Sequence, residues 1–286
     1  MTNIVTRFAP SPTGRLHLGH AYSALLAHDF ARARNGAFLL RIEDIDPGRS
    51  RPEHIDAIIE DLMWLGLQWD DEIVYQSDRL ENYAAALDRL KARGLVYPCF
   101  CTRADIAASA AAPHGPEGPL YPGTCKALSA GARAGRAARE PHAWRLDVTR
   151  ALASLPTALS WNDDGTEIPA CPQSLGDVVL ARKDAPVSYH LAVTIDDAAQ
   201  GVTDIVRGRD LYEATHVHRL LQALLDLPTP LYHHHRLLTD AAGRRLAKRH
   251  NAPTLGGLGQ GGADPEALVA ALRAGRLPAG YSAAGD

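Results

Sequence analysis

The sequence predicts an α/β fold built around a parallel sheet, and three consecutive segments near the N-terminus support that prediction. Residues 5–8 are predicted to form a short first strand, and residues 37–42 form a compact apolar strand that follows Asn35-Gly36. Between them, residues 21–34 repeat apolar side chains at helical spacing. A strand, a helix and a second strand in that order form a βαβ unit, which places the two strands parallel in one sheet.

The loop that joins the first strand to this helix is the most informative part of the chain. The run from Arg7 to His20 reads RFAPSPTGRLHLGH. Two prolines and a glycine exclude regular structure, so we expect an extended segment that turns into the helix near His17. A helix N-terminus binds phosphate groups, two imidazoles add donors, and Gly19 lets a flat base approach the backbone.

The remaining pattern predicts further helices and strands. Glu43 follows the second strand directly, at the edge where open α/β sheets bind ligands. Helical patterns cover residues 54–65, 76–91, 214–225 and 266–274, with Ser77 or Asp78 as the N-cap of the second. Regular alternation, the pattern of a half-buried strand, returns at residues 177–181 and 189–193. After Arg249 the chain is rich in glycine.

Length and charge narrow the possible functions. A chain of 286 residues with 46% hydrophobic residues holds one large domain or two small ones. A net charge of -3 argues against a general nucleic-acid coat but allows RNA in a local basic groove. Arg133, Arg136, Arg139 and Arg145 either line such a groove or form a solvated, alanine-rich face. We find no membrane-spanning run and no signal peptide, so we expect a cytoplasmic protein without a membrane partner.

The run from Arg7 to His20 resembles the HIGH signature of class I aminoacyl-tRNA synthetases, in the form of the motif that the glutamyl and glutaminyl branch carries. The basic run RRLAKR at residues 244–249 is similar to the KMSKS loop of that family, with Arg245 replacing the first lysine and Lys248 standing for the second. The resemblance implies a Rossmann-like catalytic domain that uses ATP with Mg²⁺. It implies that His17 and His20 hold phosphate, that adenine lies at Gly19, and that Arg245 and Lys248 complete the ATP site, with Lys248 on the developing charge.

The same resemblance implies a glutamate pocket. Glutamate presents two carboxylates and one ammonium, so a selective pocket needs two cationic or strong donor groups and one carboxylate. The positions that match the family's glutamate site are Arg7, Phe8, Ala9, Pro10, Ser11, Glu43, Tyr189 and Arg207. The ammonium is expected at Glu43, and either arginine can take either carboxylate.

Three of the four cysteines cluster and suggest a structural zinc site. Cys99, Cys101 and Cys125 leave a tetrahedral site one ligand short, and one intervening residue between the first two is a weaker signal than two. The resemblance to short glutamyl-synthetase-like enzymes implies Tyr121 as the fourth ligand. His114 is the alternative by ligand preference alone.

We expect four segments: residues 1–96 as the first half of the catalytic domain, 97–174 as an inserted acceptor- and zinc-binding region, 175–260 as the second half with the KMSKS-like loop, and 261–286 as a short tail. Glutamyl-tRNA synthetases continue into an anticodon-binding region, whereas fewer than forty residues follow Arg249 here. This organisation resembles the glutamyl-queuosine tRNA(Asp) synthetase family.

That second resemblance implies a monomeric enzyme that activates L-glutamate with ATP. It then transfers the glutamate to the queuosine base at the wobble position of tRNA(Asp), binding the anticodon stem-loop in its cleft. One alternative is a truncated glutamyl-tRNA synthetase that charges the 3′ end of tRNA(Glu). The other is a non-catalytic RNA-binding relative.

Overall fold

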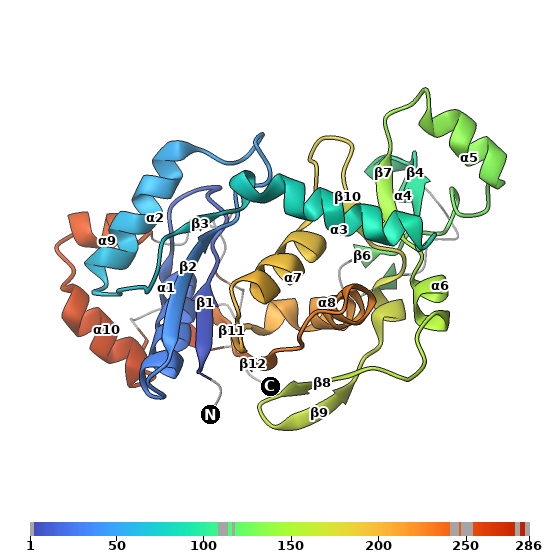
Figure 1. Ribbon diagram of the computed structural model, residues 1–286. Helices are drawn as coiled ribbons and strands as arrows, with labels where there is room; N and C mark the ends of the chain where they lie inside the picture. The colour runs from blue at the N-terminus through green and yellow to red at the C-terminus, as the bar shows by residue number, and fades with distance from the viewer. Residues whose placement is uncertain are drawn as a thin grey trace. The chain divides into compact units, whose positions relative to one another are not determined.

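The computed structural model describes residues 3–107, 114–115, 118–240, 246, 254–277 and 281–283. The chain divides into two compact units. The first unit combines residues 1–78, 201–211 and 230–286, and the second combines residues 79–200 and 212–229. Figure 1 shows the helices and strands of both units with their labels.

The first unit is built on parallel strands. β1 (Val5–Phe8) pairs in parallel with β2 (Ala37–Ile42), and β2 pairs in parallel with β3 (Val74–Tyr75). β11 (Asp204–Gly208) and β12 (Leu231–His235) form a second parallel pair. The parallel α/β arrangement predicted from the sequence is therefore confirmed.

β11 lies beside β1, so the β11–β12 pair continues the arrangement of β1, β2 and β3. The Val5 N–H donates to the Thr203 hydroxyl at 2.9 Å, and the Thr203 N–H donates to the Val5 carbonyl at 3.0 Å. The chain leaves β1 toward β2 on one side and returns as β11 on the other. The carboxyl ends of β1 and β11 thus meet at a topological switch point, where open α/β sheets bind their ligands.

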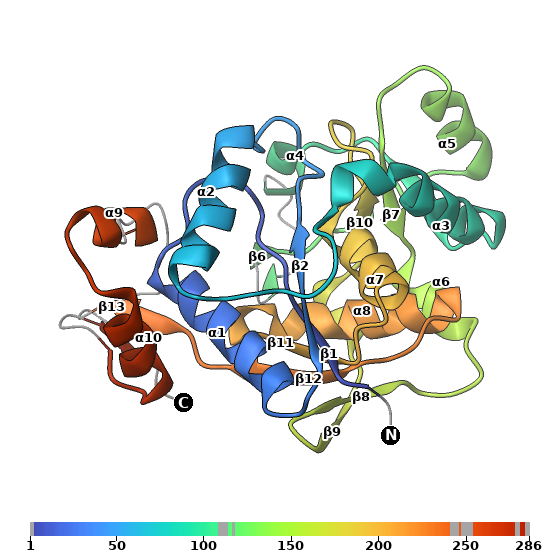
Figure 2. The ribbon, with the colours of Figure 1, turned by 60° about the vertical axis from the view of Figure 1, so that its left-hand side comes forward.

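Helix α1 (Leu18–Arg32) covers this sheet with its apolar face. It belongs to one continuous core that includes Leu25 of α1, Phe38 and Leu40 of β2, and Leu62 of α2 (Pro52–Trp64). Leu255 and Leu272 bring α9 (Leu255–Gln260) and α10 (Pro265–Arg273) into the same core. In Figure 2 these helices lie beside α1 and α2.

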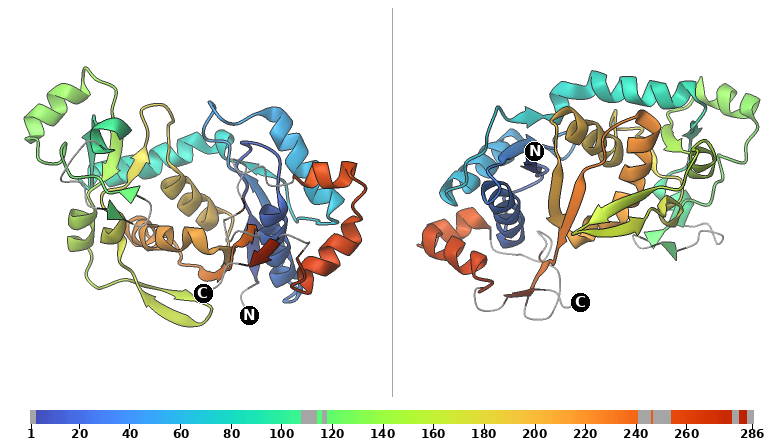
Figure 3. Two further views of the ribbon diagram at one scale, coloured as in Figure 1. Left: turned by 180° about the vertical axis from the view of Figure 1, so that it is seen from behind. Right: turned by 60° about the horizontal axis from the view of Figure 1, so that its bottom comes forward.

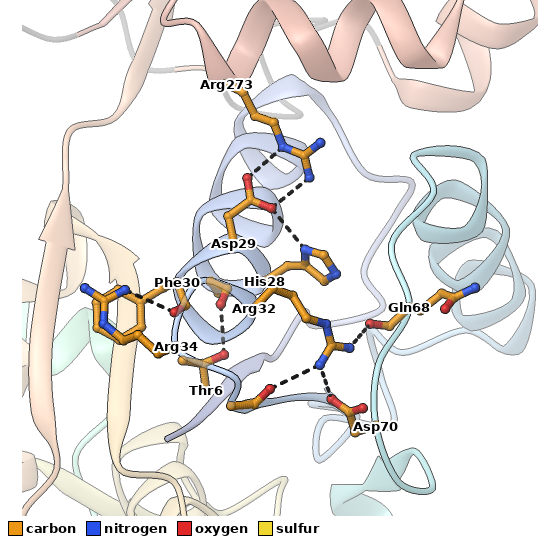
Figure 4. Close-up of polar contacts among 11 residues, drawn as sticks. Thr6, His28, Asp29, Phe30, Arg32, Arg34, Gln68, Asp70 and Arg273 are labelled. Atoms are coloured by element: carbon orange, nitrogen blue, oxygen red, sulfur yellow. Dashed lines mark hydrogen bonds and ion pairs between the residues drawn. The ribbon is translucent and has the colours of Figure 1, made fainter. Parts of the chain in front are cut away.

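Polar contacts fix the second half of α1 to its surroundings, as Figure 4 shows. The Arg32 guanidinium contacts the Asp70 carboxylate at 2.7 Å and the Gln68 carbonyl at 2.9 Å. Asp29 forms a bidentate ion pair with Arg273 of α10, in which Nε and Nη2 of the arginine each donate to one carboxylate oxygen at 2.7 Å. Because a helix is a stiff rod, these contacts also fix where its N-terminus lies.

Two short elements complete the first unit. η3 (Arg209–Leu211) follows β11 as a single 3₁₀ turn. β13 (Leu238–Asp240) and β14 (Tyr281–Ala283) form an antiparallel pair.

The second unit combines packed helices with antiparallel strands. β4 (Val96–Cys99), β7 (Ala143–Leu146) and β10 (Val179–Ala181) form an antiparallel sheet, and β8 (Ser160–Asp163) forms a hairpin with β9 (Thr166–Pro169) that Figure 3 shows in two views. Its other elements are α3 (Leu80–Ala92), α4 (Arg103–Ala107), β5 (His114–Gly115), β6 (Gly118–Pro119), α5 (Ala130–Ala137), α6 (Val148–Ala153), η2 (Pro172–Leu175), α7 (Tyr189–Ala199) and α8 (Tyr212–Leu225). The 3₁₀ turn η1 (Gln76–Arg79) has residues 76–78 in the first unit and Arg79 in the second. None of the helices within the described ranges has the length and apolar character that a membrane crossing requires.

The prediction of a strand at residues 189–193 is wrong, because this segment begins helix α7 (Tyr189–Ala199). Five alternating residues are too few to separate the two periods, and α7 packs against α3 and α8. The expected N-cap of α3 is also wrong, because its N-cap residue is Arg79. The Ser77 N–H and hydroxyl donate to Asp44 instead, at 2.8 and 2.7 Å.

Two further helix boundaries differ from the prediction. Helix α1 begins at Leu18, three residues before the predicted start. Part of the glycine-rich stretch after Arg249 forms α9, whose first turn is capped because the Gly257 N–H donates to the Thr254 hydroxyl at 3.1 Å.

The Asp29–Arg273 pair predicts a pH-dependent contribution to stability. Burial opposes ionisation of Asp29, but hydrogen bonds from Arg273 and His28 outweigh it and lower its pKa. A lowered carboxyl pKa stabilises the fold above the unfolded value of about 3.9, and that stabilisation disappears as the pH falls through the folded value. Asp29→Asn should therefore lower the free energy of unfolding at pH 7 by up to about 1 kcal/mol, because the pair is partly exposed.

Urea unfolding of both proteins at pH 7 and near pH 3 measures this difference, which should shrink at the lower pH. Asp226→Asn is the control, since Asp226 forms only a long, exposed contact of 3.4 Å with Arg89. A difference that is equal at both pH values would contradict the assignment.

Candidate functional site

Two histidines cap the N-terminus of α1 reciprocally. The Gly19 N–H donates to His17 Nδ1 at 3.1 Å, and the His17 N–H donates to His20 Nδ1 at 3.2 Å. The two rings stack with centroids 3.7 Å apart. Because Nδ1 is the acceptor in each ring, the neutral imidazoles carry their proton on Nε2. Each ring can therefore offer an Nε2–H donor to an anion, at a helix end whose first turn holds no acidic residue.

Gly19 is needed by this arrangement itself. A Cβ at Gly19 would lie 3.0 Å from His17 Cε1, a contact that forces the capping ring to move. The same Cβ would lie 4.0 Å from Cβ of Leu246. The missing side chain thus makes room for the His17 ring, in addition to the expected room for adenine.

Leu246 is the one residue of the 244–249 run that the structure describes. It is buried in the core that contains α1, and its N–H donates to the Leu238 carbonyl at 3.1 Å. Arg245 and Lys248 lie outside the described residues. Leu246 itself therefore lies close to the start of α1.

Charged residues gather at the carboxyl ends of the parallel strands. Arg7 lies in β1 and Arg207 in β11, and both are buried. Glu43 follows β2 and is also buried, and its N–H donates to the Pro10 carbonyl at 3.0 Å. The structure thus places Arg7, Glu43 and Arg207 at one edge of the sheet.

The loop residues Phe8 to Ser11 continue from β1 at this edge. Phe8 and Pro10 are buried, Ala9 is half-buried and Ser11 is exposed. The Ser11 carbonyl accepts a hydrogen bond from the Thr13 N–H at 2.8 Å, which closes the turn toward α1.

Arg41 is a residue that the sequence argument missed. Its side chain is fully buried in β2, and Nη2 lies 3.6 Å from Oε1 of Glu43. Strand residues two positions apart point to the same face, which brings this cation beside the carboxylate. The available signal was an arginine inside an otherwise apolar strand. With Arg7 and Arg207, it adds a third buried guanidinium to this edge, and guanidinium groups are suited to carboxylates and phosphates.

Tyr189 belongs to the second unit, as the first residue of α7. Its ring lies 5.5 Å from that of His218 and 5.6 Å from that of His190. His190 Nδ1 and His218 Nε2 are 3.3 Å apart, which ties α7 to α8.

The three clustered cysteines form a compact group in the second unit. The sulfur atoms of Cys99, Cys101 and Cys125 all lie within 4.8 Å of one another. The Tyr121 hydroxyl lies 4.0 Å from Cys101 Sγ and accepts the Cys125 N–H at 2.6 Å. Three sulfurs and one phenol oxygen therefore face one point, and the side chain of His114 lies outside the described residues.

The chemistry of this donor set fits a divalent metal. All four cysteines are free thiols, so no disulfide competes for the sulfurs. Burial raises the pKa of Cys101 to about 11, and the hydrogen bond with Cys125 and the charge of Cys99 add to the shift. Burial also raises the pKa of Tyr121. These groups resist ionisation without a cation, and Zn²⁺ supplies the charge that stabilises thiolates together.

Three of the four arginines proposed for a groove pack around this cluster. Arg145 lies 4.0 Å over the Tyr121 ring, and Arg136 lies 4.1 Å over the Phe100 ring. Arg133 donates to the Lys126 carbonyl at 3.1 Å. Arg139, the fourth, lies just beyond α5 and is exposed. The groove and the solvated face both stay open as interpretations of these arginines.

Comparison with known proteins gives matches over most of the chain. The family model described as the catalytic domain of class I tRNA synthetases (E and Q) matches residues 3–282. A "Glutamyl-Q tRNA(Asp) synthetase" from Rhodobacter capsulatus is 50% identical, over 92% of this chain and 97% of that protein. Proteins with the same name from Symbiobacterium thermophilum and Nocardia farcinica are 45% and 46% identical, each over 93% of this chain.

Solved structures also match. A glutamate-tRNA synthetase from Elizabethkingia anophelis superimposes with a TM-score of 0.75 at 25% identity, over 94% of this chain. A glutamate tRNA ligase from Elizabethkingia meningosepticum, in complex with its amino acid, gives a TM-score of 0.74. The present chain spans 61% and 60% of the lengths of those two proteins.

The thiol cluster leads to a metal prediction. Wild-type protein should contain about one zinc per chain, and Cys125→Ser should contain almost none, because two thiols and a phenol bind zinc weakly. Tyr121→Phe keeps the three thiols, so it should retain zinc but release it faster to a chelator. Elemental analysis and chelator competition measure both effects.

Cys171→Ser is the matched control for this experiment, because Cys171 is an exposed thiol outside the cluster. It should retain the wild-type zinc content. Zinc-free wild-type protein, or full occupancy in Cys125→Ser, would contradict the assignment.

Proposed function

Since this chain belongs to the class I tRNA synthetases, in the glutamyl-Q tRNA(Asp) synthetase family, we propose that it activates L-glutamate with ATP and transfers it to queuosine in tRNA(Asp). The observation that supports this proposal best is the pair of capping histidines at the N-terminus of α1, together with the sheet edge that holds Arg7, Glu43 and Arg207. One site binds a polyphosphate and the other an acidic amino acid. The reaction belongs in the cytoplasm, where ATP and tRNA are present.

The first step is an in-line displacement at phosphorus. A carboxylate oxygen of glutamate attacks the α-phosphorus of ATP, and the bond to pyrophosphate breaks. The carboxylate is ionised at neutral pH, so the step needs no general base. Catalysis therefore consists of holding two anions together and stabilising the charge that spreads over the transferred group.

Each residue then has a defined task in this step. The Nε2–H groups of His17 and His20 donate to phosphate oxygens, while their Nδ1 atoms keep the helix capped. Lys248 contacts the developing charge, and Arg245 assists it at the phosphates. Mg²⁺ accompanies ATP as part of the substrate. The proposed roles of Lys248 and Arg245 come from their positions in the KMSKS-like run.

Glutamate is recognised by opposite charges. Glu43 receives the ammonium, and Arg7 and Arg207 receive the two carboxylates, with Tyr189 completing the set. Arg41 balances the charge of Glu43, so the carboxylate stays buried at low cost before substrate arrives. A pocket with paired cations rejects glutamine, because an amide cannot replace a carboxylate at a guanidinium.

The second step transfers the glutamyl group. A hydroxyl of the queuosine cyclopentene ring attacks the carbonyl carbon of the adenylate, an ester forms, AMP leaves, and the hydroxyl proton passes to solvent or phosphate. The anticodon loop suits this step because its bases can be splayed out and read individually. Cys99, Cys101, Cys125 and Tyr121 would hold a structural zinc ion, which would join the end of β4 to the 121–125 segment.

The acceptor is tested with labelled glutamate, ATP and three RNAs. Queuosine-containing tRNA(Asp) should be labelled, whereas queuosine-free tRNA(Asp) and tRNA(Glu) should stay unlabelled, because only the first carries the cyclopentene hydroxyl. Nuclease digestion should then locate the label in the anticodon fragment. Label at the 3′ end of tRNA(Glu) would instead establish the truncated glutamyl-tRNA synthetase.

The KMSKS-like run is tested by Lys248→Ala. Loss of the ammonium should lower kcat of glutamate-dependent pyrophosphate exchange by about 100-fold or more, with a change of only a few-fold in KM for glutamate. Lys91→Ala is the control, because Lys91 is a lysine of α3 in an ion pair with Asp88. Equal exchange rates in wild type and Lys248→Ala would overturn the role given to this lysine.

A further inference from the structure

A buried histidine lies directly beside Arg207. The parallel register of β11 and β12 places Arg207 opposite His234, and Nε of the arginine lies 3.2 Å from Nε2 of the histidine. Both side chains are buried, with Arg207 4% and His234 9% exposed. Solvent therefore contributes little to this contact, and its geometry is set by the two strands.

The direction of this hydrogen bond follows from the chemistry of the two groups. An arginine Nε can only donate, so His234 Nε2 accepts and the ring proton lies on Nδ1. Burial and the positive charge of Arg207 lower the pKa of His234 to about 2. The imidazole therefore stays neutral, and remains an acceptor, throughout the physiological pH range.

Two further contacts orient the same guanidinium. Nη2 of Arg207 donates to the Leu211 carbonyl at 3.1 Å, and the central carbon lies 5.3 Å from the centre of the Tyr232 ring. The rings of Tyr232 and His234 are parallel within 1°, on the same face of β12. The guanidinium is thus restrained at two of its nitrogens and against one ring.

The two histidines that flank His234 contact other groups. His233 Nε2 lies 2.9 Å from the Asp204 carboxylate, and His235 Nε2 lies 3.1 Å from the Ser23 hydroxyl. Neighbouring strand residues point to opposite faces, so His234 faces away from His233 and His235. His234 is the member of this run that the structure joins to Arg207.

We propose that His234 is a positioning residue for glutamate. By accepting the hydrogen bond from Arg207 Nε, it fixes the plane of the guanidinium, so that the guanidinium N–H groups meet a substrate carboxylate in a productive orientation. Arginine recognises carboxylates through this planar fork, and a guanidinium free to rotate loses that advantage. This inference rests on the proposed function, since it requires Arg207 to bind glutamate.

The test compares three variants in glutamate-dependent pyrophosphate exchange. His234→Phe keeps a ring but removes the acceptor, and should raise KM for glutamate about ten-fold or more while KM for ATP changes less than two-fold. His234→Gln places an amide oxygen near the position of Nε2, and should recover most of the wild-type KM. His233→Gln is the matched control on the same strand and should stay within two-fold of wild type.

A double-mutant cycle separates positioning from a purely structural effect. Arg207→Lys removes the Nε donor, so adding His234→Phe to it should raise KM for glutamate no further. If His234→Phe fails to fold, His234→Asn replaces it, because its shorter side chain ends before the guanidinium.

The outcomes distinguish the two levels of inference. Wild-type protein without glutamate-dependent exchange would overturn the proposed function itself. An active wild type with an unchanged glutamate KM in a folded His234→Phe or His234→Asn variant would overturn only the role of His234. Equal increases in the wild-type and Arg207→Lys backgrounds would also overturn it, because the histidine would then act independently of Arg207.

Discussion

The reciprocal hydrogen bonds between His17 and His20 are the interaction on which the rest of the site depends. They satisfy two backbone N–H groups at the start of α1 and, at the same time, determine which ring nitrogens carry protons. Helix capping and the proposed phosphate binding thus use opposite sides of the same two rings. This arrangement requires Gly19, since a side chain there would displace the ring of His17.

Burying charge at the edge of a sheet is costly, and the first unit reduces that cost by giving each buried ionic group a partner. Glu43 lies near Arg41, and Arg207 donates to His234. These partners differ in kind, because a carboxylate is balanced by a cation whereas the guanidinium meets a neutral acceptor. The Arg207 guanidinium therefore keeps its charge, which suits ligands that carry carboxylates and phosphates.

The second unit applies the same principle to sulfur. Cys99, Cys101 and Cys125 face the Tyr121 hydroxyl, and burial opposes the ionisation of Cys101 and Tyr121. Arg145 and Arg136 cover the aromatic rings beside the cluster. A cation between the sulfurs would remove the conflict between burial and negative charge, which is why this donor set fits zinc.

By itself, the sequence determined the features that are local in the chain. The βαβ start, the loop that leads into α1 and the three clustered cysteines all depend on residues close to one another, and the structure contains each of them. Tertiary structure decided what depends on partners far apart in sequence. Ser77 donates to Asp44 instead of capping α3, residues 189–193 form a helix packed between α3 and α8, and His234 meets Arg207. The pairing of His234 with Arg207 follows only from the register of β11 and β12, because a shift of one residue would turn the histidine to the opposite face.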